Sequence, residues 1–131
     1  MKVLALDYGS ARTGVAVSDP TGTVARPLAV VERAASEAGI RRLLELAREQ
    51  DADAIVVGLP VTLRGERGRQ AEETEAFVEL LRAATDLTVD TFDERYTTKL
   101  ARASGGKAER DAVAAAHLLS SYLTWKSARP A

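Results

Sequence analysis

The sequence has no cysteine, few aromatic residues and no long apolar run, and each absence narrows the possible functions. Without cysteine, disulfide bonds and thiolate metal sites are excluded. Aromatic residues make up 5% of the chain, which disfavours nucleic-acid binding through a series of stacked bases. No apolar stretch approaches the roughly 20 residues of a membrane span, and Asp7 interrupts the apolar start too early for a secretory signal. We therefore expect a cytoplasmic protein without a membrane partner.

The chain also lacks an excess of charge of either sign. It has 18 Lys and Arg against 19 Asp and Glu, and a single histidine. Proteins that bind nucleic acid through its backbone usually present a basic surface. The near-zero net charge therefore disfavours such binding. A local cluster of basic residues beside an acidic site would still allow it, because the two sets of charges cancel in the net charge. A length of 131 residues suits one domain spanning residues 1–131.

The hydrophobic pattern predicts a chain in which strands and helices alternate after an initial run of strands. Residues 54–58 are apolar throughout, which is typical of a strand buried on both faces. The segment 70–84 instead has apolar residues at helical spacing, with a predicted buried stripe of Thr74, Phe77, Val78 and Leu81. We expect strands at 2–6, 14–18, 26–31, 54–58 and 87–91, and helices at 36–50, 70–84, 97–103 and 110–125. This order predicts an α/β fold with a mixed five-stranded sheet and helices on both faces.

Three acidic residues stand where such a sheet carries its chemistry. Asp7 lies at the carboxyl end of the first expected strand, Glu94 follows the end of the fifth, and Asp111 opens the last helix. Ligands of open α/β sheets bind outside the carboxyl ends of the strands. Oxygen ligands without His or Cys companions suit Mg²⁺ or Mn²⁺ rather than zinc. A pair of such ions could polarise a phosphodiester and activate water, so these three are the candidate catalytic and metal-binding residues.

Each acid also has a structural alternative. Asp111 could cap its helix, Glu94 could form a surface ion pair with Arg95, and Asp7 could hold the turn that follows it. The sequence by itself leaves these alternatives open.

Basic residues accompany the acids in two segments. The turn from Asp7 to Gly14 has glycines that let a phosphate approach the backbone, and Arg12 could grip that phosphate through two hydrogen bonds. An arginine-bearing loop follows the strand at 54–58 and could bind a nucleic-acid backbone. The structural alternative for the turn is an ordinary hairpin, and that for the loop is a solvated surface loop. His117, inside an apolar helix, is expected to pack rather than to catalyse. The candidate nucleic-acid-binding residues in these segments and beyond are Arg12, Arg64, Arg67, Arg69 and Lys99.

Four motifs, in this order, resemble the bacterial YqgF-type family of Holliday-junction resolvases and pre-16S rRNA nucleases. They cover nearly the whole chain and comprise Leu6-Asp7-Tyr8-Gly9 with Arg12 and Gly14, Gly58-Leu59-Pro60 with Gly65, Asp93-Glu94-Arg95-Tyr96-Thr97-Thr98, and Asp111 with Ala114-Ala115. The resemblance implies a ribonuclease H-like fold and a divalent-metal endonuclease. From the three acids we expect Mg²⁺ or Mn²⁺, with two ions. Asp7, Glu94 and Asp111 match the family's acidic positions, and Arg12 and Arg95 its basic ones. One departure is that the strand at 54–58 ends without the acid found in better-known junction resolvases.

The leading hypothesis is therefore hydrolysis of phosphodiester bonds in structured nucleic acid. The resemblance implies two substrates, the 5′ end region of pre-16S rRNA or branched DNA, and cutting a junction would require two sites related by symmetry and hence a homodimer. A phosphotransferase or ATPase is an alternative, because actin-like and sugar-kinase folds also begin with an Asp-x-Gly turn. A third hypothesis is a non-catalytic RNA-binding assembly factor.

Overall fold

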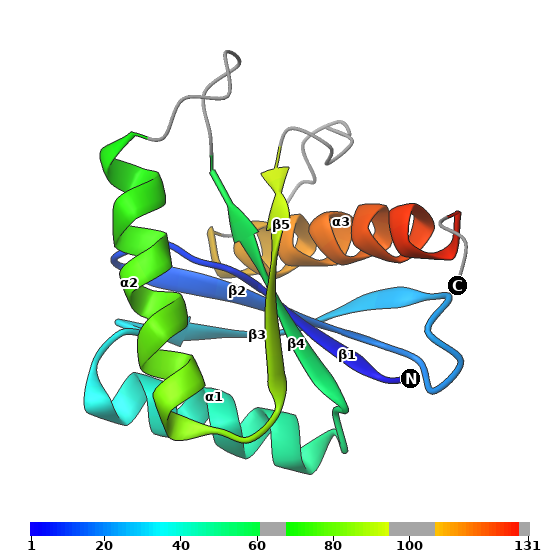
Figure 1. Cartoon of the computed structure of the whole chain (residues 1–131), viewed down its shortest axis with the longest axis horizontal. Coiled ribbons are helices and arrows are strands. Elements are labelled where there is room, and N and C mark those ends of the chain that lie inside the picture. Colours follow the sequence, from blue (N-terminus) through cyan, green and yellow to red (C-terminus); the bar gives the residue numbers. More distant parts are fainter. Residues whose placement is uncertain (61–67, 95–106, 129–131) are drawn as a thin grey trace.

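A computed structural model describes residues 1–60, 68–94 and 107–128 of the chain. In these residues five strands form one sheet in the order β3-β2-β1-β4-β5. Strand β1 pairs antiparallel with β2 and parallel with β4, so the sheet is mixed and β1 lies at its centre (Figure 1). The strands are β1 (Val3–Asp7), β2 (Arg12–Ser18), β3 (Ala25–Glu32), β4 (Ala54–Leu59) and β5 (Thr88–Asp93).

Side chains of the central strand alternate between two cores, one on each face of the sheet. Leu4 and Leu6 pack with α1 (Glu37–Glu49) and α2 (Arg69–Ala84). Val3 and Ala5 pack on the opposite face with α3 (Lys107–Ser127). Figure 1 shows α1 and α2 on one side of the sheet and α3 on the other. The mixed five-stranded sheet with helices on both faces is confirmed.

The helices follow the expected apolar spacing, and their boundaries differ in one place that matters for the site. All four residues of the expected α2 stripe are buried. Ser36 begins α1 as its N-cap, and its hydroxyl oxygen accepts a hydrogen bond from the Gly39 backbone at 3.0 Å. Helix α3 begins at Lys107 rather than at 110, which makes Asp111 its fifth residue. Asp111 therefore does not open the helix and cannot be its N-cap. The expected short helix at 97–103 lies outside the described residues.

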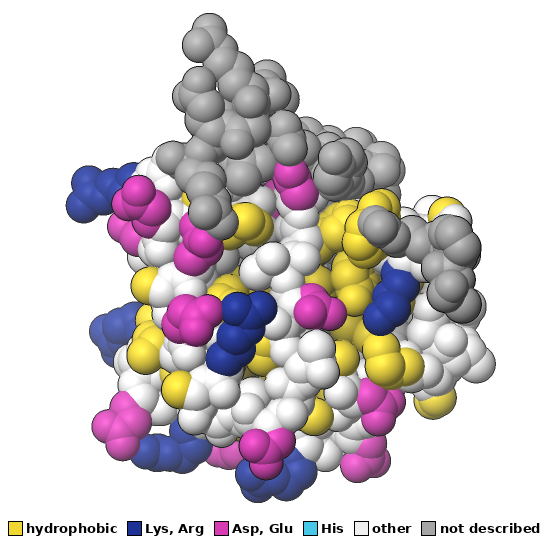
Figure 2. All heavy atoms as spheres, viewed as in Figure 1, with side chains coloured by type: hydrophobic (Ala, Val, Ile, Leu, Met, Phe, Trp, Pro, Cys, Tyr) yellow, Lys and Arg dark blue, Asp and Glu magenta, His cyan; other side chains and the backbone are white. Residues whose placement is uncertain are grey.

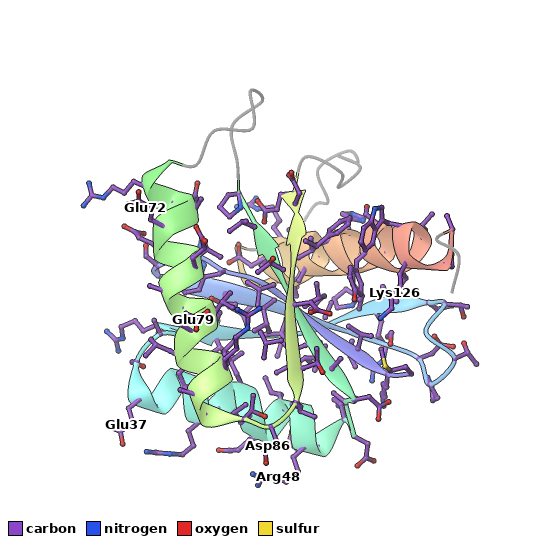
Figure 3. The ribbon with its side chains drawn as sticks, in the orientation of Figure 1. Glu37, Arg48, Glu72, Glu79, Asp86 and Lys126 are labelled. Atoms are coloured by element: carbon purple, nitrogen blue, oxygen red, sulfur yellow. The ribbon has the colours of Figure 1, made fainter. Side chains whose placement is uncertain are left out.

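The surface in the described ranges carries charges of both signs. Figure 2 shows Lys and Arg side chains interspersed with Asp and Glu on the face that it presents, without a continuous basic patch. The charged side chains labelled in Figure 3 project outward from the helices and from the connection before β5. None of the described helices is both long enough and apolar enough to cross a bilayer.

Candidate active site

The three candidate acids lie on the same face of the sheet. Successive side chains of a strand point to opposite faces, and Ala5 and Phe92 both belong to the core beneath α3. Asp7, two residues after Ala5 at the end of β1, therefore faces α3. Glu94 directly follows β5 and stands two residues after Phe92, which directs it to that face as well. Asp111 is carried by α3 itself. The fold thus directs all three toward one edge of one layer.

A glycine in β4 makes room for contact between Asp7 and Glu94. Strand β4 lies between β1 and β5, and two strand spacings separate the outer pair by about 10 Å. A Cβ atom added at Gly58 would lie 2.7 Å from Glu94 Oε1 and 2.9 Å from Leu118 Cδ2. Because Gly58 has no side chain, the carboxyl of Glu94 reaches over β4 and hydrogen-bonds to Asp7. Strand β4 thus has no acid at its end, and the side chain of Glu94 occupies the space above Gly58.

A second glycine fixes where α3 lies. Gly14 of β2 is the register partner of Asp7 in β1. A Cβ atom at Gly14 would lie 1.9 Å from the backbone oxygen of Asp111, so α3 packs directly on the β2 backbone at this point. Asp111 is consequently held across from Asp7, and its negative charge contributes to raising the pKa of Asp7.

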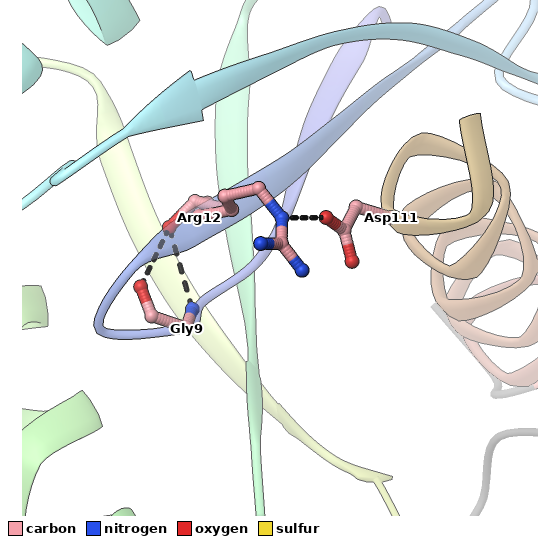
Figure 4. Close-up of polar contacts among 4 residues, drawn as sticks. Gly9, Arg12 and Asp111 are labelled. Carbon is pink, nitrogen blue, oxygen red and sulfur yellow. Dashed lines mark hydrogen bonds and ion pairs between the residues drawn. The ribbon is translucent and has the colours of Figure 1, made fainter. Parts of the chain in front are cut away.

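Arg12 at the start of β2 pairs with Asp111. Its Nε donates to Asp111 Oδ2 at 2.6 Å, and the two side chains are 39% and 31% exposed (Figure 4). The turn before Arg12 is closed by the Thr13 hydroxyl, which lies 3.4 Å from both the backbone nitrogen and the backbone oxygen of Gly9. A guanidinium that is half accessible at this edge can exchange a carboxylate partner for a phosphate.

The Asp7–Glu94 pair holds a proton near neutral pH. Burial, the hydrogen bond to Asp7 and the charges of Asp7 and Asp93 raise the pKa of Glu94 to about 8. Burial also raises the pKa of Asp7, although the hydrogen bond from Glu94 opposes this shift and the charge of Asp111 adds to it. Glu94 is therefore the proton donor and Asp7 the acceptor. Two like charges so close cannot both ionise without a compensating cation.

The site contains side chains that could bind a metal ion, but the described acids are not arranged around a common point. Among the described residues, no group of three or more His, Cys, Asp or Glu side chains is arranged to hold a metal. Asp7 and Glu94 offer the hard oxygen donors that suit Mg²⁺ or Mn²⁺, whereas Asp111 is engaged with Arg12. Binding an ion by all three acids would require Asp111 to leave Arg12 and Glu94 to lose its proton.

The basic residues expected from the sequence have different locations. Arg12 lies at the site. Arg69 begins α2, is 92% exposed in its side chain and pairs with Glu73 at 3.6 Å. Arg64, Arg67, Arg95 and Lys99 lie outside the described residues, so their proposed contacts with nucleic acid stay predictions.

Sequence reasoning missed two features of the site. The first is that Gly58, which pairs with Phe92 of β5, leaves room for the Glu94 side chain to reach Asp7. The second is Arg33, which the pairing of Glu32 with Arg12 brings beside the β1–β2 turn. A partial signal for the second was present, since Arg33 stands two residues after the strand expected at 26–31.

Raising the pH should destabilise the metal-free protein. Glu94 has a higher pKa in the folded chain than its ordinary 4.5, so the folded state binds more protons than the unfolded state between about pH 4.5 and 8. Its contribution to the free energy of unfolding is full below pH 4.5 and is lost as pH rises through 8. Urea denaturation in a chelating buffer at pH 5, 7 and 9 measures the decline, and Glu94→Gln should flatten it. An equal decline in both proteins would refute the assignment of the proton to Glu94.

Comparisons with known proteins agree on the fold and on the family. Residues 1–125 match the family model RuvX, described as Holliday junction resolvase. The "Putative pre-16S rRNA nuclease" of Chloroflexus aurantiacus is 38% identical over 98% of this chain and 90% of its own. The protein of the same name from Rubrobacter xylanophilus is 43% identical over 93% of this chain and 91% of its own.

A solved structure shows the same architecture. The structure titled "T. thermophilus RuvC in complex with Holliday junction substrate" aligns with a TM-score of 0.61 at 19% identity, covering 100% of this chain and 99% of the other. At this identity the likeness concerns the fold alone, and it confirms the ribonuclease H-like architecture expected from the sequence.

Proposed function

The chain belongs to the RuvX family of Holliday junction resolvases, and we propose that it is a divalent-metal-dependent endonuclease that trims the 5′ end of pre-16S rRNA. The observation that carries the proposal is the proton-sharing pair of Asp7 and Glu94, with Asp111 and Arg12 beside it at one edge of a ribonuclease H-like sheet. Such an arrangement of acids and a guanidinium suits the hydrolysis of a phosphodiester.

Each residue has a role that follows from its surroundings. Asp7 is fixed at the end of the central strand and is the principal oxygen donor. Glu94 carries a proton that it must release before it can donate to a cation, because its pKa is raised to about 8. Asp111, which pairs with Arg12 in this structure, would leave it to help hold the cation. Arg12 would then be available to hold a non-bridging oxygen of the phosphate that is cut.

The donor set fits Mg²⁺ or Mn²⁺. It consists of carboxylate oxygens, and burial together with neighbouring negative charge raises the pKa values of Asp7 and Glu94, a cost that a bound cation would offset. When bound, the metal would polarise the phosphate and activate a water molecule for attack. We propose two ions, because a metal pair can polarise the phosphodiester, activate water and stabilise the leaving oxygen.

The proposal of an RNA substrate rests on the relatives. Both curated relatives described above carry the pre-16S rRNA nuclease name and are similar over nearly the whole chain. The alternative substrate, branched DNA, is favoured by the family description and by the junction bound to the structural neighbour. Cutting a junction symmetrically requires two active sites and hence a homodimer.

A side-by-side cleavage assay decides between these substrates. A 5′-extended pre-16S rRNA fragment and a four-way DNA junction are presented to the same preparation, with Mg²⁺, with Mn²⁺ and with a chelator. We expect cuts in the RNA that depend on the metal, and a molecular mass measured alongside gives the oligomeric state.

Two other results of this assay would change the proposed function. Symmetric cuts in the junction by a dimer, with the RNA left intact, would replace the rRNA proposal with the resolvase. Binding of the RNA without cleavage under any metal condition would refute the enzyme and favour a non-catalytic assembly factor.

A further inference from the structure

An open hollow of about 540 Å³ lies beside the candidate active site. It is bordered by the β1–β2 turn and by the end of β3, and it is lined by Ser10, Ala11, Arg12, Glu32 and Arg33. Arg12 belongs to both places, since it lines the hollow and also pairs with Asp111. Through Arg12 the hollow adjoins the edge at which the acids lie.

The backbone of Arg33 is held in a conformation that side chains rarely adopt. Its φ is 45°, in the left-handed region that favours glycine. Hydrogen bonds fix it on both sides, because its N–H donates to Ala11 O at 3.0 Å and its carbonyl accepts from the Ser36 N–H at 2.9 Å and hydroxyl at 2.7 Å. An arginine at such a position carries a conformational cost that glycine would avoid.

The charges around the hollow favour an anion. The residues that line it include two arginines, Arg12 and Arg33, and one acid, Glu32. Arg12 is paired with Asp111, whereas Arg33 makes no salt bridge with any residue in the described parts of the chain. Its side chain is exposed. When Arg12 is released from Asp111, the two arginines exceed the one carboxylate by one positive charge, and Arg33 is the arginine that has no ion pair among the described residues.

We propose that this hollow binds a phosphate of the substrate strand next to the one that is cut, and that Arg33 is its principal contact. The inference rests on the proposed function and adds to it a second point of attachment for the same strand. A guanidinium matches phosphate in shape and charge. Arg12, between the hollow and Asp111, links the two phosphates and sets the register of the strand across the acids.

The test uses the full chain and the 5′-extended pre-16S rRNA fragment. Three substitutions separate charge from backbone strain: Arg33→Ala removes the guanidinium, Arg33→Gly removes it and relieves the strain, and Arg33→Lys keeps the charge. Arg48→Ala is the matched control, because Arg48 is an exposed arginine in the last turn of α1, away from the carboxyl ends of β4 and β5 (Figure 3).

We expect Arg33→Ala and Arg33→Gly to raise KM about tenfold with kcat within about twofold of the parent. The slope of log affinity against log salt should decrease by about one. Arg33→Lys should recover most of the affinity, and Arg48→Ala should resemble the parent. Melting temperatures should show that Arg33→Gly is at least as stable as Arg33→Ala, so that the loss is not one of folding.

The inference and the proposed function fail in different ways. If the parent cuts the RNA and the Arg33 variants have the KM and salt slope of Arg48→Ala, the phosphate site is refuted and the nuclease stands. If the parent cuts neither this RNA nor the four-way junction, the nuclease is refuted, and anisotropy with the same labelled RNA decides the phosphate site. The site is supported if Arg33→Ala and Arg33→Gly bind the RNA more weakly than the parent while Arg33→Lys and Arg48→Ala do not. Equal binding by all variants overturns it.

Discussion

Asp7→Asn is expected to reduce kcat for cleavage by about a thousandfold or more, which corresponds to several kcal/mol of lost transition-state stabilisation. Asn has the shape of Asp but only one oxygen and no charge, so it cannot hold a cation at the end of β1. The fold should persist, because Asp7 is half-buried near two other acids and its neutralisation removes their repulsion. We therefore expect the melting temperature without metal to stay level or rise.

A matched control for this substitution is Asp90→Asn on β5. Asp90 is exposed in the adjoining part of the sheet and lies outside the cluster of acids. Single-turnover cleavage of the 5′-extended RNA in Mg²⁺, with melting curves alongside, compares the two. Parent-like cleavage by purified Asp7→Asn would show that Asp7 is not the catalytic acid. A loss of equal size in Asp90→Asn would point to a general effect of charge.

Gly14→Ala is expected to lower the free energy of unfolding by about 3 kcal/mol or more. The added methyl group would lie 1.9 Å from the Asp111 backbone oxygen, and a backbone atom of α3 cannot move aside without moving the helix. For a chain of this size the expected fall in melting temperature is about 10 °C. Because displacement of α3 also carries Asp111 away from Asp7, the folded fraction should cleave more slowly as well.

Gly68→Ala provides the comparison for this prediction. A Cβ atom at Gly68 would meet no heavy atom of the described residues within 4 Å, and its φ of −96° suits any residue. Its effect on stability should remain within about 1 kcal/mol, the size of a change at a helix N-cap. Similar melting temperatures for Gly14→Ala and Gly68→Ala would contradict the close packing of α3 on β2.

The fold could be predicted from periodicity because each segment has a different apolar pattern. The unbroken run in β4 and the helical stripe of α2 from Thr74 to Leu81 each match only one kind of element. The start of α3 is not evident from the sequence because three of the four residues from Lys107 to Arg110 are charged and carry no apolar period. The later start left a helix cap open as an alternative role for Asp111, whereas its position inside the helix directs it toward β2.

The composition of the site was more accessible from sequence than its geometry. A carboxylate after each of two strands is visible along the chain, and the fold brings Asp7 and Glu94 into contact. The means of that contact depend on strand order, since Gly58 separates the acids only when β4 lies between β1 and β5. The pairing of Arg12 with Asp111 joins residues 99 positions apart, and no local pattern encodes it.

The position of β1 within the sheet has a consequence for how activity would be lost. Asp7 ends a strand with neighbours on both sides, whereas Glu94 follows β5, which is an outermost strand. Local opening of an outermost strand requires fewer broken hydrogen bonds than opening of a central one. Mild heating or low denaturant would therefore separate the two acids while most of the sheet stays intact, so that inactivation would precede global melting.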